Sequence, residues 1–202
     1  DSLRWPLGRF LQGIEGYLRL PSPRQDLAGY QQQLQGYLDQ HAIGLLIPTC
    51  EEIFYLSQAF ATYIRPTEWL IPERRLLFEL HHKYQSLSLL TGLGEVRTPA
   101  TRMLTSCSQI TDDPQTILKP VYSRFGRRVI RTPNPGVLND RQLNEHIPWV
   151  QQQKLEGVAL CNYAVFEHGR LIAHQAYQPK YCFNQAAGSY FVPHQDRRLD
   201  DF

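Results

Sequence analysis

Residues 116–126 read Thr-Ile-Leu-Lys-Pro-Val-Tyr-Ser-Arg-Phe-Gly, and this stretch decides how the second half of the chain is interpreted. The apolar run from Ile117 to Val121 has the length of a strand, and Ser123 and Gly126 follow where a loop is expected. Lys119 is flanked by apolar residues on both sides. Because an unpaired ammonium group is costly to bury, its charge must face a polar partner, and an anionic ligand suits it better than an apolar core.

The same region is rich in cations. Between residues 116 and 135 the chain has no acidic residue and five basic ones: Lys119, Arg124, Arg127, Arg128 and Arg131. Cations, a hydroxyl group and a flexible backbone on one strand-loop-strand unit suit a polyphosphate, whose oxygens accept from N–H groups and neutralise positive charge. A solvated basic face is the alternative, and composition alone does not decide between them.

Short apolar runs continue through the second half of the chain and predict an antiparallel or mixed sheet. His168-Gly169 is expected to form a tight turn between two of the strands. The expected strands are residues 117–121, 129–130, 149–150, 158–160, 163–166 and 171–173.

The first part of the chain has a different pattern, in which helices flank a short strand. Apolar residues at helical spacing predict a helix over residues 26–40, and a second helix is expected from Cys50, with Thr49 as its N-cap. Between them, residues 43–47 are apolar without alternation. This is typical of a buried strand in a parallel sheet that is covered on both faces.

The periodicity breaks between Arg65 and Pro72, and this stretch is interpreted as a connection, with a domain boundary near residue 70. A helix is then expected over residues 73–90, interrupted at Lys83 and stopped by the glycines at positions 92 and 94. His81-His82, next to Lys83, is expected on the surface of this helix.

Composition excludes several classes of protein. The chain has 202 residues, 42% of them hydrophobic, and a net charge of +2, a balance that argues against binding nucleic acid through bulk charge. No stretch is long and apolar enough to span a bilayer, and the N-terminus lacks a signal-peptide layout and an initiator Met, so we expect a piece of a longer protein. The four cysteines are widely spaced, which predicts reduced thiols and a cytoplasmic location.

Four segments, in this order, resemble the ATP-grasp superfamily: the helix carrying Lys83, the strand and loop at 117–126, residues 148–157 and residues 187–191. Residues 46–52 also resemble the end of the small Rossmann-like domain that precedes the ATP-binding part in this superfamily. The resemblance implies an α/β (α+β) fold. Residues 1–70 would form an N-terminally incomplete Rossmann-like domain, and residues 71–202 a C-terminally incomplete ATP-binding domain with antiparallel or mixed sheets.

The resemblance also implies where ATP would bind. Two lysines of the family reach the nucleotide phosphates, a mobile loop closes over them, and the backbone of a hinge segment, here Gln153 to Leu155, faces adenine. By match of pattern, the nucleotide-binding residues are Lys83, Lys119, Ser123, Arg124, Gly126, Gln152, Gln153, Lys154, Leu155 and Glu156.

The chain departs from the family pattern in four places, one of which is Gln152, where the hinge usually begins with an acid. The loop has one glycine instead of several, which suggests a clamp by the side chain of Arg124 or Ser123. Val158-Ala159 stands where the family often has a glutamate. No segment after Phe191 resembles the acidic, asparagine-containing strand that binds magnesium in the family, so magnesium ligands are expected outside this chain.

The function that the resemblance implies is an ATP-dependent ligase that phosphorylates a carboxylate and passes the acyl group to an amine or related nucleophile. ATP, magnesium and an unknown small-molecule carboxylate would be its partners, and a homodimer is one expected assembly because many relatives are dimers. A non-catalytic nucleotide-binding or interaction module that keeps the fold is the alternative, and no catalytic residue is assigned. RNA binding is a lesser third hypothesis, because the cations are not interleaved with aromatic residues.

Overall fold

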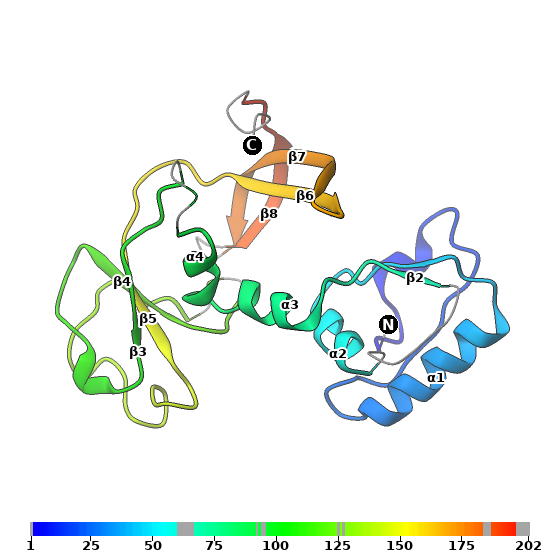
Figure 1. Ribbon diagram of the computed structural model, residues 1–202, viewed down its shortest axis with the longest axis horizontal. Coiled ribbons are helices and arrows are strands. Elements are labelled where there is room, and N and C mark those ends of the chain that lie inside the picture. The colour runs from blue at the N-terminus through cyan, green and yellow to red at the C-terminus, as the bar shows by residue number, and fades with distance from the viewer. Residues whose placement is uncertain are drawn as a thin grey trace. The chain divides into compact units, whose positions relative to one another are not determined.

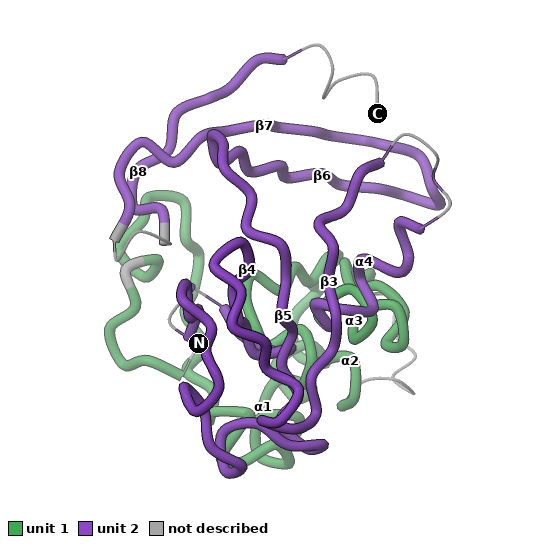
Figure 2. The backbone as a smooth tube through the Cα atoms, turned by 90° about the vertical axis from the view of Figure 1, so that its left-hand side faces the viewer, with its two compact units in different colours: residues 1–81 green, residues 82–202 purple. Residues whose placement is uncertain are grey.

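A computed structural model describes residues 2–59, 67–91, 93, 96–124, 126, 128–183 and 187–196. The chain divides into two compact units, residues 1–81 and 82–202 (Figure 2). The division lies at the end of helix α3 (Arg74–His81), whereas the sequence places a domain boundary near residue 70. The family assigned to each part stays a prediction.

Unit 1 is built around helix α1 (Leu27–Gln40), which confirms the helix expected over residues 26–40 (Figure 1). The carboxylate of Asp26 caps it by accepting a hydrogen bond from the N–H of Gly29 at 2.8 Å. One face of the helix is buried, as its apolar spacing requires. The core cluster on that face comprises Leu20, Tyr30, Leu34, Leu38 and Leu56. A short 3₁₀ helix, η1 (Leu7–Phe10), precedes α1 in the chain.

The strand expected in the first part of the chain is present, but it is short and not buried. β1 (Leu45–Leu46) pairs in parallel with β2 (Glu68–Trp69). Leu45 and Ile47 are 49% and 53% exposed, so the prediction of a strand covered on both faces is wrong here. In a sheet of two strands both strands are edge strands, so neither is an interior strand that helices could cover on both faces. β2 also lies inside the stretch that was interpreted as a connection, which corrects that interpretation.

Helix α2 (Glu52–Ala59) begins later than expected. The carboxylate of Glu52 accepts hydrogen bonds from the backbone N–H groups of Thr49 and Cys50, at 2.7 and 3.0 Å. Glu52, an acid in the first turn of α2, where the helix dipole favours negative charge, therefore also satisfies two backbone donors that precede the helix. The role of Thr49 as N-cap stays a prediction.

The helix expected over residues 73–90 is interrupted at Lys83, as predicted. α3 ends at His81, and α4 (Gln85–Leu89) begins after a turn at residues 82–84. The glycines at positions 92 and 94, which were expected to stop the helix, lie outside the described residues.

The first sheet of unit 2 has three antiparallel strands in the order β3-β5-β4 (Figure 1). They are β3 (Thr101–Leu104), β4 (Thr116–Pro120) and the central β5 (Trp149–Gln153). Its core includes Leu104, Leu118, Leu143 and Trp149, each at most 1% exposed, and the short 3₁₀ helix η2 (Cys107–Gln109) borders it. The expected strand at residues 129–130 is reduced to an isolated bridge between Ile130 and Leu118.

The second sheet of unit 2 is also antiparallel, in the order β6-β7-β8. Its strands are β6 (Cys161–Glu167), β7 (Arg170–Phe183) and β8 (Ala187–Pro193). His168 and Gly169 form the predicted turn, with φ angles of 49° and 80°, the left-handed region that a tight hairpin requires. Residues 158–160 form no strand, which corrects that prediction; β6 begins only at Cys161.

The protein is thus a mixed α/β molecule, with helices and a small parallel sheet in unit 1 and antiparallel sheets in unit 2. Within the described ranges, no helix has the length and apolar character needed to cross a membrane. All four cysteines are free thiols.

Candidate functional site

Two lysines from separate elements of unit 2 lie at the same end of strand β4. Lys83 lies in the turn between α3 and α4. Its ammonium group donates to the backbone carbonyls of Val121, at 3.3 Å, and Ser123, at 2.7 Å. Its backbone N–H also donates to the Val121 carbonyl. Because Val121 and Ser123 directly follow β4, these bonds fix Lys83 beside the strand that carries Lys119.

Lys119 belongs to a polar row that crosses the sheet. Its Nζ donates to Oε1 of Gln152 on β5 at 2.6 Å, and Nε2 of Gln152 donates to Oγ1 of Thr101 on β3 at 2.9 Å. Thr101 is directly opposite Gln152 in the register, and Lys119 is its diagonal neighbour, so the three side chains share one face. Gln152 therefore orients the ammonium group without neutralising it.

The two ammonium groups are half-buried and carry unneutralised charge. Neither forms an ion pair with a carboxylate within the described part of the chain. Burial lowers the pKa of both lysines, and the positive charge of Lys119 further lowers the pKa of Lys83. Two cations held close together against neutral acceptors form an arrangement that an anionic ligand would stabilise.

His82 positions Lys83 from inside the protein. Its side chain is buried, and its Nδ1 accepts hydrogen bonds from the backbone N–H groups of Tyr84 and Gln85, each at 3.2 Å. Its ring packs edge-on against Tyr122, with centroids 5.2 Å apart. Burial lowers the pKa of His82, consistent with a neutral ring that caps α4. The expectation of a surface histidine is wrong, because residue 82 turns inward where the helix breaks.

The loop after β4 carries three of the predicted site residues. Ser123 contributes its carbonyl to Lys83, while its hydroxyl donates to the Pro120 carbonyl at 3.4 Å. Arg124 is exposed, and Gly126 has a φ of 61°, a left-handed conformation that favours glycine. Phe125 and Arg127 lie outside the described residues. Arg128, one of the cations of the basic stretch, lies over the ring of Trp149 at 5.5 Å.

The backbone of the predicted hinge is partly engaged. The N–H of Gln153 donates to the Ala100 carbonyl at 2.8 Å, and that of Lys154 to the Gln115 carbonyl at 2.7 Å. Leu155 is 66% exposed, and its N–H makes no hydrogen bond to any described residue. The side chains of Lys154 and Glu156 approach each other at 4.0 Å on the surface.

The structure thus joins four of the predicted residues directly by hydrogen bonds: Lys83 to Ser123, and Lys119 to Gln152. The bonds of Gln153 and Lys154 run instead to Ala100 and Gln115. Sequence reasoning missed Thr101 and His82 as supports of the site. A threonine on an unpredicted strand and a histidine next to a lysine give no local signal of these roles.

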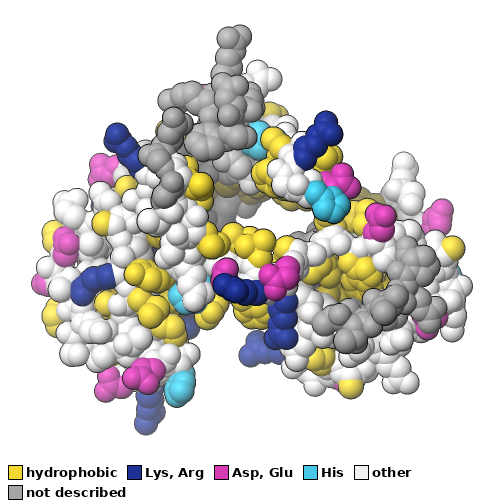
Figure 3. All heavy atoms as spheres, viewed as in Figure 1, with side chains coloured by type: hydrophobic (Ala, Val, Ile, Leu, Met, Phe, Trp, Pro, Cys, Tyr) yellow, Lys and Arg dark blue, Asp and Glu magenta, His cyan; other side chains and the backbone are white. Residues whose placement is uncertain are grey.

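Metal ligands are not assembled here: across the described residues, no group of three or more His, Cys, Asp or Glu side chains could hold a metal ion. On the face drawn in Figure 3, basic and acidic side chains both appear, at several separate places.

The chemistry that this arrangement offers is the binding of a compact polyanion by two ammonium groups with neutral supports. No protein-family model and no curated protein matches this chain in sequence comparisons.

Proposed function

We propose that unit 2 is the ATP-binding part of an ATP-grasp protein, and that Lys83 and Lys119 hold the nucleotide phosphates. The observation that carries this proposal is the pair of half-buried ammonium groups that have no carboxylate partner among the described residues. An ammonium group has three N–H donors; Lys119 uses one on Gln152, and Lys83 uses two on backbone carbonyls. Donors therefore remain on both groups for phosphate oxygens.

The loop and the hinge supply the remaining contacts of the proposed site. Ser123, Arg124 and Gly126 would cover the phosphates, with the exposed guanidinium of Arg124 able to make a bidentate contact. The free N–H of Leu155 would donate to the adenine edge. Gln153 would contribute its backbone, and Gln152, Lys154 and Glu156 would flank the base and ribose.

The proposed activity is that of a ligase that joins a carboxylate to an amine or related nucleophile through an acylphosphate. In this reaction the two lysines would keep the phosphates in place and stabilise the negative charge that develops on them. No step is assigned to magnesium, because the described residues offer no ligand set for it. Four free thiols agree with a reducing compartment, and we propose a cytoplasmic location.

Isothermal titration of the 202-residue chain with ADP and with a non-hydrolysable ATP analogue, with and without magnesium, tests the proposal. Saturable binding of both nucleotides that depends little on magnesium is expected, since protein cations would hold the phosphates. Failure of both nucleotides to bind under every condition would overturn it. ADP release in the presence of a panel of carboxylates and amines would then distinguish a ligase from a nucleotide-binding module that lacks catalysis.

A further inference from the structure

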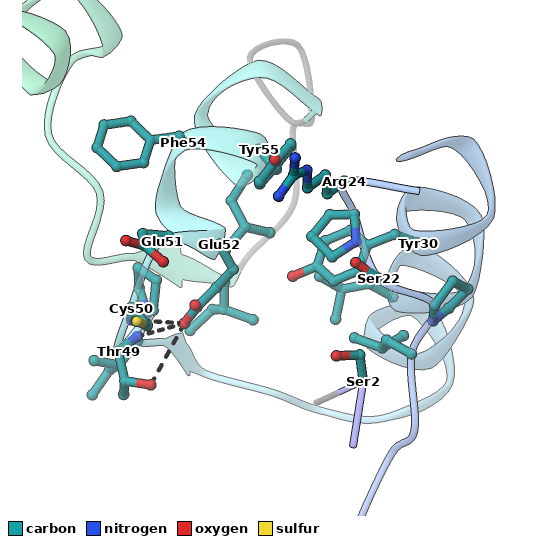
Figure 4. A pocket seen from close by; sticks show the side chains of 18 of the residues that line it. Ser2, Ser22, Arg24, Tyr30, Thr49, Cys50, Glu51, Glu52, Phe54 and Tyr55 are labelled. Atoms are coloured by element: carbon teal, nitrogen blue, oxygen red, sulfur yellow. Dashed lines mark hydrogen bonds between the residues drawn. The ribbon is translucent and has the colours of Figure 1, made fainter. Parts of the chain in front are cut away.

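Unit 1 contains a cavity of about 870 Å³ that the function proposed for unit 2 does not use. The cavity lies where β1 ends, at Ile47 and Pro48, and its wall includes residues from the loop before α1, from α1 itself and from α2 (Figure 4). Its volume is within the range of small-molecule sites, roughly 300–1,000 Å³. In open α/β sheets, ligands bind outside the carboxyl ends of parallel strands.

A phenol with no hydrogen-bond partner among the described residues lies in the wall of this cavity. Tyr30 is only 6% exposed, yet its hydroxyl makes no hydrogen bond within the described part of the chain. Among the described residues no buried side-chain oxygen or nitrogen lacks a partner, so this hydroxyl oxygen keeps contact with solvent and can be reached by a ligand. Burial, together with the nearby charge of Glu52, raises the pKa of Tyr30 to about 12, so the hydroxyl keeps its proton. It is a neutral group that can both donate and accept.

A fixed carboxylate lies across the cavity from this phenol. Figure 4 shows Tyr30 on α1 and Glu52 on α2 on opposite sides of the space. The backbone N–H groups of Thr49 and Cys50 donate to Oε1 of Glu52 and hold the half-buried carboxylate in place. Its second oxygen takes part in no hydrogen bond to a described residue. Glu52 and Tyr30 together can accept from a protonated amino group.

The rest of the wall supplies the opposite charge and an apolar surface. Arg24, an exposed cation on the loop before α1, lines the same cavity, as does the hydroxyl-bearing Ser22. Leu34, Leu46 and Phe54 provide apolar wall. One small cavity thus contains a carboxylate that can bind an ammonium group, a guanidinium that can bind a carboxylate, and an apolar wall. These features together recognise a zwitterion with an apolar side chain.

We infer that the cavity of unit 1 binds a free aliphatic amino acid, with its ammonium group on Glu52 and Tyr30, its carboxylate on Arg24 and its side chain on the apolar wall. Every residue that forms this site belongs to unit 1, so the site shares no residue with the nucleotide site proposed in unit 2.

The test is an ¹H–¹⁵N NMR titration of the full chain with three probes: L-leucine, 3-methylbutylamine, which lacks the carboxylate, and 4-methylpentanoate, which lacks the amine. The amide signals of Thr49 and Cys50 report directly on ligand binding at Glu52, because both N–H groups donate to its carboxylate. Leucine should shift them saturably, and each single-function probe should bind at least about tenfold more weakly. The amides of Gln153 and Lys154, in unit 2, should not move.

Two variants separate recognition from folding. Glu52→Gln keeps an oxygen that can accept from Thr49 and Cys50 but removes the charge, and Tyr30→Phe removes a hydroxyl that has no partner to lose. Both should fold, as cooperative thermal unfolding would show, and bind leucine at least about tenfold more weakly, whereas Tyr163→Phe, at an exposed tyrosine, should bind normally.

Absence of leucine-induced shifts, or unchanged leucine affinity in both variants, would overturn the inference whatever unit 2 binds. The amine probe binding as tightly as leucine would overturn the amino-acid assignment, because Arg24 would then contribute nothing.

Discussion

Replacing Lys119 with methionine removes one of the two ammonium groups of unit 2 and keeps a long, unbranched side chain. In the wild type this ammonium group makes one hydrogen bond, to the neutral Oε1 of Gln152 at 2.6 Å, which leaves two N–H donors for a ligand. A hydrogen bond that involves a charged group contributes about 1.5–3 kcal/mol. The Kd for ADP should therefore rise by about 10- to 150-fold in Lys119→Met.

The assay is isothermal titration with ADP and, separately, with adenosine. Adenosine has no phosphates, so its affinity should be the same in the wild type and in Lys119→Met if the lysine contacts phosphate alone. Lys180→Met is the matched control, because Lys180 is an exposed lysine on β7. Both variants should show the cooperative thermal unfolding of the wild type.

Two results would refute this reasoning. An unchanged Kd for ADP in Lys119→Met would remove Lys119 from the site. An equal loss of ADP and adenosine affinity would mean that the substitution distorts the sheet rather than removing a phosphate contact, since Gln152 would then have lost the partner that orients it.

Three further substitutions test the site and its support. Gln152→Glu would place a carboxylate against Lys119, raise the pKa of that lysine and weaken ADP binding about tenfold; unchanged affinity by titration would contradict this. The pKa of His82 is lowered from its ordinary 6.5, so the unfolded chain binds more protons. In urea unfolding, the free energy of unfolding should therefore fall as the pH drops below about 6.5, and it should fall less in His82→Asn. The same pH dependence in the wild type and in His82→Asn would mean that His82 is not the group responsible. Leu104→Ala, at a side chain with no exposed surface, should lower the free energy of unfolding by about 2–5 kcal/mol in the same assay, and a loss under 1 kcal/mol would contradict the packing described.

Elements with strong local signals could be predicted from the sequence. The helix over residues 26–40 has apolar residues at regular helical spacing, and the hairpin at His168-Gly169 has a residue pair that tolerates left-handed backbone. The interruption at Lys83 was also predicted, and the antiparallel sheets of the second half are one of the two arrangements, antiparallel or mixed, that the sequence predicts. In each case neighbouring residues determine the conformation.

Elements that depend on distant partners could not be predicted. β2 is two residues long and lies in a region interrupted by proline, and β3 mixes polar and apolar residues without a clear period. Both exist because another strand offers backbone groups to pair with. The burial of His82 likewise depends on Tyr122, which is far away in sequence.

The candidate site was predictable only in part, for the same reason. Lys119 stands out by its apolar flanking residues and Lys83 only by the resemblance, whereas the row from Lys119 through Gln152 to Thr101 follows from strand register. The cavity of unit 1 was missed because its polar groups come from separate segments that only the fold brings together.

The most direct test of nucleotide binding by unit 2 uses an ATP analogue with an electrophilic acyl phosphate, which transfers its acyl group to the amine of a lysine beside the bound phosphates and releases ATP. The lysines of this chain are Lys83, Lys119, Lys154 and Lys180, and tryptic mass spectrometry can report on each. The lowered pKa of Lys83 and Lys119 favours their reactive neutral form. Acylation of Lys83 or Lys119 that excess ATP suppresses is expected. Acylation confined to Lys154 and Lys180, or acylation that ATP does not suppress, would contradict phosphate binding by the lysine pair.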